Sequence, residues 1–140
     1  MVLTIWSFFA AAAGSCVLLK NVANTLPFAG TLDAPVRVAV FGIGGVGGSA
    51  VEALARMGIG TLDLIDNDRV CLTNLNRQIF ATRSTVGRYK VDAARERIAD
   101  IDPEIIVNTY PTFYLPENAA QFDFRQFDYV VDAIDTGTAK

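Results

Sequence analysis

A glycine-rich turn between two short apolar runs is the feature that most constrains the fold of this chain. Residues 36–41 form a nearly continuous apolar run, five glycines follow within residues 42–48, and a second apolar run, residues 62–65, ends in Asp66. Between them, residues 46–57 place apolar side chains at helical spacing. A buried strand, a tight turn, a helix and a strand that ends in an acid are typical of nucleotide-binding folds. The sequence therefore predicts a nucleotide site here.

Each part of this stretch has a physical role in holding a phosphate. The glycines of this turn are Gly42, Gly44, Gly45, Gly47 and Gly48. A residue without a Cβ can adopt positive φ and lets a phosphate approach the main chain. The helix that begins near Val46 points unpaired N–H groups and a partial positive charge at that phosphate. Asp66 is expected to accept hydrogen bonds from a ribose. The alternative is that the glycines only allow close packing of helix and strand.

The remaining periodicity predicts an α/β protein with a Rossmann-like, doubly wound and mainly parallel sheet. The sheet is expected to end after its fourth strand. The further elements that we expect are a helical turn at residues 74–79, a helix at 90–100, strands at 105–110 and 129–132, and a short helix at 116–121.

The N-terminal part of the chain differs from the rest in composition. Residues 1–19 have no charged side chain and are rich in Ala, Phe, Val and Leu. They fit a membrane anchor, a docked apolar segment, or a sequence foreign to the domain that follows. Residues 20–35 read as a linker. We therefore expect residues 1–35 to lie outside a nucleotide-binding domain that occupies residues 36–140.

Composition excludes several kinds of site. The chain has no histidine, which excludes a histidine-based triad or zinc site. Its two cysteines lack metal-type spacing and indicate a reducing compartment. The net charge is −3, but residues 77–97 contain six basic residues and only two acids. That excess suits the phosphates of a nucleotide or an RNA, or else is a solvated helix face.

A second group of polar residues lies between the second strand and the second helix. Asn74, Asn76, Arg77 and Lys90 are expected near the carboxyl ends of the strands, where open α/β sheets bind ligands. Arginine offers planar contacts to phosphate and lysine a point charge. Asp135, at the end of the fourth strand, is a hard oxygen ligand suited to Mg²⁺.

Together these residues carry a family resemblance. The motifs, in chain order, are G-I-G-G-V-G, L-I-D-N-D, L-T-N-L-N-R-Q, T-V-G-R-Y-K and D-A-I-D. They resemble the ThiF/MoeB/HesA-type adenylating proteins of the ubiquitin-activating-enzyme superfamily. The motifs V-C-L-T-N-L-N-R-Q-I and F-Y-L-P-E-N most resemble its tRNA threonylcarbamoyladenosine dehydratase (TcdA/CsdL) branch. The resemblance spans residues 36–140.

The resemblance implies MgATP binding and adenylation of a carboxylate, with release of pyrophosphate. It assigns the phosphates to a loop of Gly42, Gly44, Gly45 and Gly47 and to Asn74, Arg77 and Lys90, and it includes Asn76 among the ATP-binding residues. It assigns the ribose to Asp66, with Asp68 nearby, and Mg²⁺ to Asp135. Arg77, Lys90 and Asp135 are the expected catalytic residues.

In the dehydratase branch the substrate is a tRNA that carries threonylcarbamoyladenosine. Its activated carboxylate is attacked internally, and a cyclic product forms with net loss of water. No enzyme nucleophile is required, so Cys71 is expected to be a packed loop thiol. The branch implies a cytoplasmic homodimer. A sulfur-carrier protein or a cysteine desulfurase is an alternative partner, and adenylation of a sulfur-carrier C-terminus is the alternative reaction.

The chain also departs from the family pattern. Residues 1–35 contain no arginine, whereas relatives place one there that reaches a partner's ATP site. The chain ends five residues after Asp135, and Thr136 stands where many relatives have Asn. We therefore expect a partial member, for which a non-catalytic ATP-binding module is an alternative. A nicotinamide-dependent dehydrogenase is a further alternative. It would use the glycine turn and Asp66, but it gives no function to the L-T-N-L-N-R-Q loop.

Overall fold

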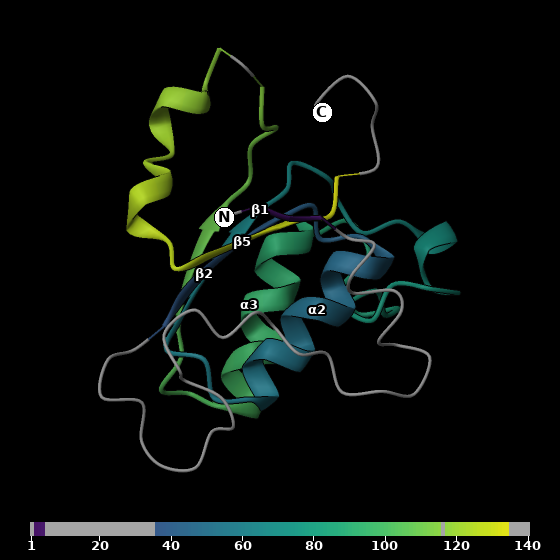
Figure 1. Ribbon diagram of the computed structural model, residues 1–140. Helices are drawn as coiled ribbons and strands as arrows, with labels where there is room; N and C mark the ends of the chain where they lie inside the picture. The colour runs from purple at the N-terminus through teal and green to yellow at the C-terminus, as the bar shows by residue number, and fades with distance from the viewer. Residues whose placement is uncertain (1, 5–35, 116, 135–140) are drawn as a thin grey trace.

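Five parallel strands form one sheet in the computed structural model, which describes residues 2–4, 36–115 and 117–134 (Figure 1). Their spatial order is β1-β5-β2-β3-β4. The strands are β1 (Val2–Thr4), β2 (Arg37–Phe41), β3 (Thr61–Ile65), β4 (Ile106–Tyr110) and β5 (Tyr129–Asp132). The α/β class and the four parallel strands predicted within residues 36–140 are confirmed, with each boundary within one residue.

The central strands have apolar sequences because both of their faces are covered. Four of the five residues of β2 and of β3 are buried. An antiparallel sheet with one wet face would instead show alternation of apolar and polar residues. The nearly continuous apolar runs were therefore a reliable signal for parallel strands in the middle of the sheet.

Two α-helices cover one face of the sheet (Figure 1). They are α2 (Gly45–Arg56) and α3 (Lys90–Ile101), and both confirm the predicted helices within one residue at each end. The shorter elements are 3₁₀ helices: η1 (Leu72–Asn74), η2 (Ala119–Gln121) and η3 (Phe124–Gln126). The short helix expected at 116–121 is η2. The helical turn expected at 74–79 begins two residues earlier, as η1.

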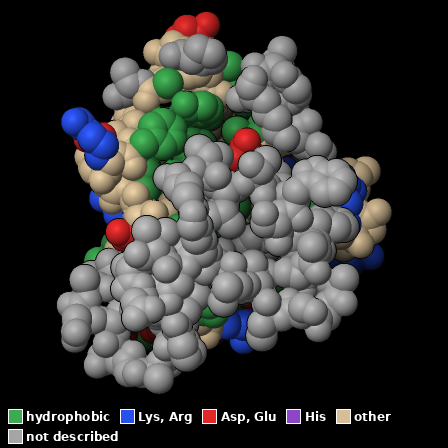
Figure 2. Space-filling model, viewed as in Figure 1, with side chains coloured by type: hydrophobic (Ala, Val, Ile, Leu, Met, Phe, Trp, Pro, Cys, Tyr) green, Lys and Arg blue, Asp and Glu red, His purple; other side chains and the backbone are tan. Residues whose placement is uncertain are grey.

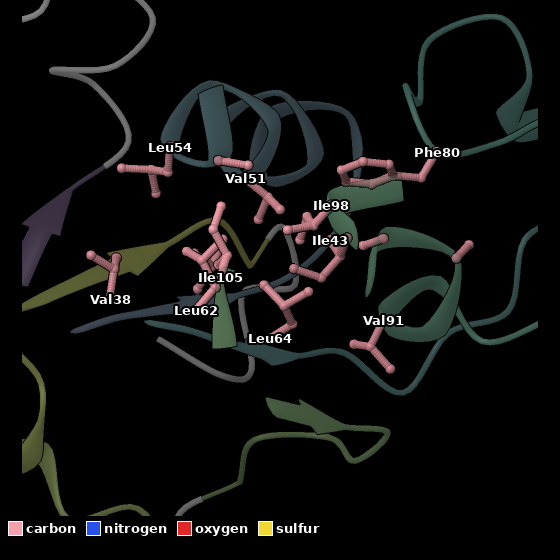
Figure 3. Packing of buried hydrophobic residues seen from close by; sticks show 14 of the residues in the cluster. Val38, Ile43, Val51, Leu54, Leu62, Leu64, Phe80, Val91, Ile98 and Ile105 are labelled. Carbon is pink, nitrogen blue, oxygen red and sulfur yellow. The ribbon is translucent and has the colours of Figure 1, made fainter. Parts of the chain in front are cut away.

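The main core lies between these helices and the sheet (Figure 3). Val51 and Leu54 of α2 and Val91 and Ile98 of α3 point toward the side chains of the strands. Ile43 lies within the glycine turn and is also fully buried in this core. The turn is therefore anchored to the core by its one large apolar side chain.

The opposite face of the sheet is covered by the segment between β4 and β5. Because β5 lies beside β2 and β4 lies at the far edge, this segment has to cross the sheet. Its rings pack edge-on against Phe41 of β2, with centroids at 4.9 Å for Tyr114 and 5.6 Å for Phe122. Figure 2 shows hydrophobic side chains gathered over this part of the molecule. The order in which strands are added to the sheet therefore reverses at β2: β3 and β4 follow on one side of it and β5 lies on the other, with all of them parallel.

The strand β1 was not predicted. Val2, Leu3 and Thr4 pair in parallel with Val130, Val131 and Asp132. The apolar edge that four strands would leave exposed at β5 is therefore paired. The rest of the apolar N-terminal stretch and the linker lie outside the described residues, so the three hypotheses for residues 1–19 stay predictions. Within the described part of the chain, no helix has the length and apolar character needed to cross a membrane.

Candidate nucleotide site

Two glycines of the turn are required by packing. Gly42 has a φ of +87°, and a Cβ there would lie 2.7 Å from the carbonyl oxygen of Ala133. A Cβ on Gly47 would overlap the carbonyl oxygen of Gly42. The turn, the first turn of α2 and the end of β5 therefore meet without space for side chains. For these two positions the close-packing interpretation of the glycines holds.

The other two predicted glycines have room for a Cβ, with neighbours at ordinary contact distance. A Cβ on Gly44 would meet nothing closer than the side-chain nitrogen of Gln78 at 4.0 Å, and one on Gly45 nothing closer than the carbonyl oxygen of Arg77 at 3.5 Å. Gly44 caps α2, and among the described residues no side chain makes a cap hydrogen bond to the N–H groups that begin this helix. An opening with free N–H groups at a helix N-terminus fits a phosphate.

Asp66 connects β3 to the glycine turn. Its Oδ2 accepts a hydrogen bond from the backbone N–H of Ile43 at 2.6 Å, and its Oδ1 accepts one from the backbone N–H of Asp68 at 2.7 Å. The position of this carboxylate in the sequence predicts that it holds a ribose. The structure adds that the same carboxylate fixes the turn. Each oxygen keeps a second lone pair with which it can accept a hydrogen bond from a ribose hydroxyl. The ribose contact itself stays a prediction.

Lys90 and Asp68 form an ion pair at the beginning of α3. The Nζ of Lys90 donates to Oδ2 of Asp68 at 2.7 Å, and the backbone N–H of Lys90 donates to the carbonyl oxygen of Asp68 at 3.0 Å. Lys90 is only 6% exposed, whereas the side chain of Asp68 is 63% exposed. A buried ammonium needs such a partner because its desolvation is costly. The pairing joins two residues that were predicted separately.

The loop that contains η1 lies against the glycine turn. The Oδ1 of Asn74 accepts a hydrogen bond from the backbone N–H of Cys71 at 3.0 Å, so Asn74 fixes the loop itself. Arg77 is exposed, and its Nη1 donates to the carbonyl oxygen of Thr73 and to Oδ1 of Asn76. The side chain of Arg77 lies beside Gly45. The structure therefore brings Arg77 to the predicted phosphate loop, while contacts of these three residues with ATP stay predictions.

Two further predictions concern an acid and a thiol. Asp135, the expected Mg²⁺ ligand and catalytic acid, lies outside the described residues. Among the residues that are described, no group of three or more acids and cysteines could hold a metal ion. Cys71 was expected to be packed, and this is wrong: it is exposed, on the surface of the loop, where its Sγ lies 3.7 Å from the carbonyl oxygen of Arg69.

A buried polar network beneath the site was not predicted. Asp63 of β3 is fully buried and accepts hydrogen bonds from Arg37 at 2.8 and 2.9 Å and from Asn108 and Tyr110 at 3.1 Å each. The hydrogen bond from Arg37 to Asp63 raises the pKa of Arg37, against the opposing effect of burial. Burial, and next the charge of Asp63, raise the pKa of Tyr110. The signal in the sequence was a single acid within an otherwise apolar strand.

This network supports the site through β4. The carbonyl oxygen of Tyr110 accepts the backbone N–H of Asp66 at 3.2 Å. The strand whose side chains surround Asp63 therefore also holds the acid that fixes the glycine turn.

Comparisons with known proteins agree with this geometry. The sequence model of the ThiF family matches residues 32–140. A tRNA threonylcarbamoyladenosine dehydratase of Haemophilus influenzae is 50% identical over 103 residues, which are 74% of this chain and 40% of that protein. The enzyme of the same description from Bacillus subtilis is 54% identical over 99 residues, which are 71% of this chain and 39% of that protein.

A solved structure is similar as well. It is the Escherichia coli tRNA N6-threonylcarbamoyladenosine dehydratase in complex with ATP, with a TM-score of 0.70 and 50% identity. The similarity covers 72% of this chain and 42% of that chain. This chain therefore spans about 40% of the length of the curated relatives that it matches.

Proposed function

The chain belongs to the ThiF family, and on that premise we propose that it forms the nucleotide site of an enzyme that adenylates a carboxylate with ATP. The more specific proposal is a tRNA threonylcarbamoyladenosine dehydratase. Relatives of that description at 50% and 54% identity support it, as does the similar solved structure, which contains ATP. Cytoplasmic location and a homodimer belong to the same proposal.

The observation that carries the proposal is the position of Asp66 between the glycine turn and the Asp68–Lys90 pair. Asp66 accepts hydrogen bonds from Ile43 in the turn and from Asp68, and Asp68 pairs with Lys90. A ribose acceptor, a phosphate loop and a cation are therefore joined by three consecutive contacts. A nicotinamide-dependent dehydrogenase would use the turn and Asp66 but has no role for Lys90 or Arg77.

Each residue then has a defined task toward ATP. Gly44 and Gly45 leave room for phosphate oxygens, and the N–H groups at the beginning of α2 face them. Arg77 and Lys90 offset the negative charge that develops on the departing pyrophosphate when a substrate carboxylate attacks the α-phosphorus. To contact a phosphate oxygen, the Nζ of Lys90 has to leave Oδ2 of Asp68, or donate to both oxygens at once.

Magnesium is part of the proposal through Asp135, whose carboxylate oxygen has the chemistry that Mg²⁺ prefers. The ion would neutralise phosphate charge next to the two cations. The proposed substrate carboxylate belongs to the threonylcarbamoyl group of a modified adenosine in tRNA. Activation makes its oxygen a good leaving group, and internal attack then closes the ring with net loss of water.

The first test is a calorimetric titration of the full chain with MgATP, with NAD as the control. Saturable binding of ATP and weak or absent binding of NAD are expected. Preferential NAD binding would contradict the proposal. The second step is pyrophosphate release with tRNA that carries threonylcarbamoyladenosine. Release that occurs only with a sulfur-carrier protein would assign the alternative acceptor, and ATP binding without release under either condition would indicate a non-catalytic module.

Substitutions then test the residues. Arg77→Ala and Lys90→Met should each reduce pyrophosphate release by about a hundredfold or more, which is typical of a lost charge contact in the transition state. Lys90→Met keeps the length and the apolar stem of the buried side chain, so its circular dichroism spectrum should match that of the parent chain. Full activity in both variants would exclude their proposed roles.

A further inference from the structure

The basic residues of this protein divide into two groups by their partners. Of the ten described lysines and arginines, seven have a carboxylate within 4.0 Å. Among the described residues, the arginines without such a partner are Arg69, Arg77 and Arg83. All three lie on the segment between β3 and α3, which also carries the candidate site. Their charges are therefore free to meet an anion from outside the chain.

Arg69 is held in a fixed plane. Its guanidinium carbon lies 3.9 Å from the ring centroid of Tyr89, and its Nη1 donates to the carbonyl oxygen of Gly87 at 2.7 Å. An antiparallel bridge pairs the backbones of the same two residues. Tyr89 also packs against the main core. One face of the guanidinium is thus covered by a ring that packs against the core, while the Arg69 residue is exposed.

This stacked pair lies next to the proposed reaction site. Arg69 follows Asp68 and Tyr89 precedes Lys90, so the two pairs are neighbours on the same two stretches of backbone. The segment that carries Arg83 is joined to the Arg69 backbone one residue further on, because the backbone N–H of Gly87 donates to the carbonyl oxygen of Val70 at 2.8 Å. Arg83 is exposed, and its side chain makes no contact with the other described residues that would hold its charge.

We propose that the surface formed by Arg69, stacked on Tyr89, and by Arg83 binds a single-stranded stretch of the substrate RNA beside the modified nucleotide. This inference rests on the proposed function. Arg69 stacks its plane on a nucleobase, and Arg83 contacts a backbone phosphate. Unpaired bases of RNA are recognised by stacking on aromatic rings and guanidinium planes, next to cations that follow the phosphates. A partner protein would instead call for acidic side chains, and the flat support of Arg69 would serve no purpose there.

The test is the affinity of the full chain for an anticodon stem-loop RNA that carries threonylcarbamoyladenosine, measured by fluorescence anisotropy at several salt concentrations. Arg69→Gln and Arg83→Gln should each weaken binding at least about fivefold, in line with the loss of one base stack or one phosphate contact. Arg83→Gln should also reduce the salt slope by about 0.7, the value for one phosphate of a single strand. Arg69→Lys keeps the charge but not the plane, so it should not restore affinity.

The matched control is Arg125→Gln, which removes one charge from a side chain that is 90% exposed. Arg125 lies on the segment between β4 and β5, which covers the opposite face of the sheet. It should leave RNA affinity unchanged. Each variant is also titrated with MgATP, whose affinity should be that of the parent chain. Equal RNA affinity for Arg69→Gln, Arg83→Gln and the control overturns the inference, as does a change in self-association without a change in RNA affinity. If the unsubstituted chain does not bind MgATP, that result overturns the proposed function instead.

Discussion

The carboxylate of Asp66 and the backbone N–H of Ile43 are joined by a 2.6 Å hydrogen bond across 23 residues of sequence. This bond fixes the end of β3 to the glycine turn. Asp66→Asn replaces one acceptor oxygen with a donor that faces an N–H group. We expect a loss of about 1–3 kcal/mol in the free energy of unfolding, the cost of an unsatisfied polar group, and weaker binding of ATP. Urea unfolding measures the stability and calorimetry the ATP affinity. An unchanged free energy of unfolding would show that the turn does not depend on its hydrogen bond to Asp66.

Gly47 and Gly45 should respond differently to the same small change. Gly47→Ala places a Cβ onto the carbonyl oxygen of Gly42, so α2 must shift and we expect a loss of stability of about 2–4 kcal/mol. Gly45→Ala meets nothing closer than 3.5 Å, so the fold should persist. Its methyl group projects where the phosphates are proposed to lie, and ATP affinity should fall. Thermal unfolding with an ATP titration separates the two outcomes; equal stability of both variants would contradict this geometry.

The Arg37–Asp63 pair should be more costly to break than to replace. Arg37→Met leaves a fully buried carboxylate whose remaining donors, among the described residues, are Asn108 and Tyr110. Because the side chain of Arg37 is 31% exposed and water can reach this place, we expect a loss of about 2–3 kcal/mol, below the usual cost for a fully buried pair. Arg37→Met combined with Asp63→Leu should recover much of the stability. A double-mutant cycle in urea measures the coupling, and purely additive losses would argue against it.

The raised pKa of Tyr110 leads us to expect a lower free energy of unfolding at alkaline pH. Its pKa is raised above 10.0 by burial and by the charge of Asp63, so the folded chain keeps the phenol proton at a pH where the unfolded chain loses it. The stabilisation is therefore present below about pH 10 and is lost as the pH rises through the folded pKa. In Tyr110→Phe, the decline of unfolding free energy above about pH 9 should be less steep. Tyr114→Phe is the control, and the same slope in both variants would refute the prediction.

Much of the fold was predictable because local sequence and long-range packing agree. The apolar runs of β2 and β3 and the helical spacing in α2 and α3 predicted these elements within one residue, since burial on both faces of a strand or one face of a helix leaves a direct periodic signal. The motifs identified the family for a similar reason, because a phosphate loop requires its residues in a fixed order along the chain. Residue types and spacing were enough to predict that the glycine turn, Asp66 and Lys90 lie close together, and the contacts that join Ile43, Asp66, Asp68 and Lys90 agree with this.

Tertiary structure alone decided which partners these residues have. The pairing of β1 with β5 joins residues more than 120 positions apart, and no local pattern indicates it. The contacts of Asp63 with Arg37, Asn108 and Tyr110, and the ion pair of Lys90 with Asp68, depend on which strands and loops become neighbours in the sheet. The sequence by itself determined the family, the main helices and strands, and the order of the motifs from which the site is proposed. The distances between those parts follow from strand register and buried charge, which arise only when distant segments pack together.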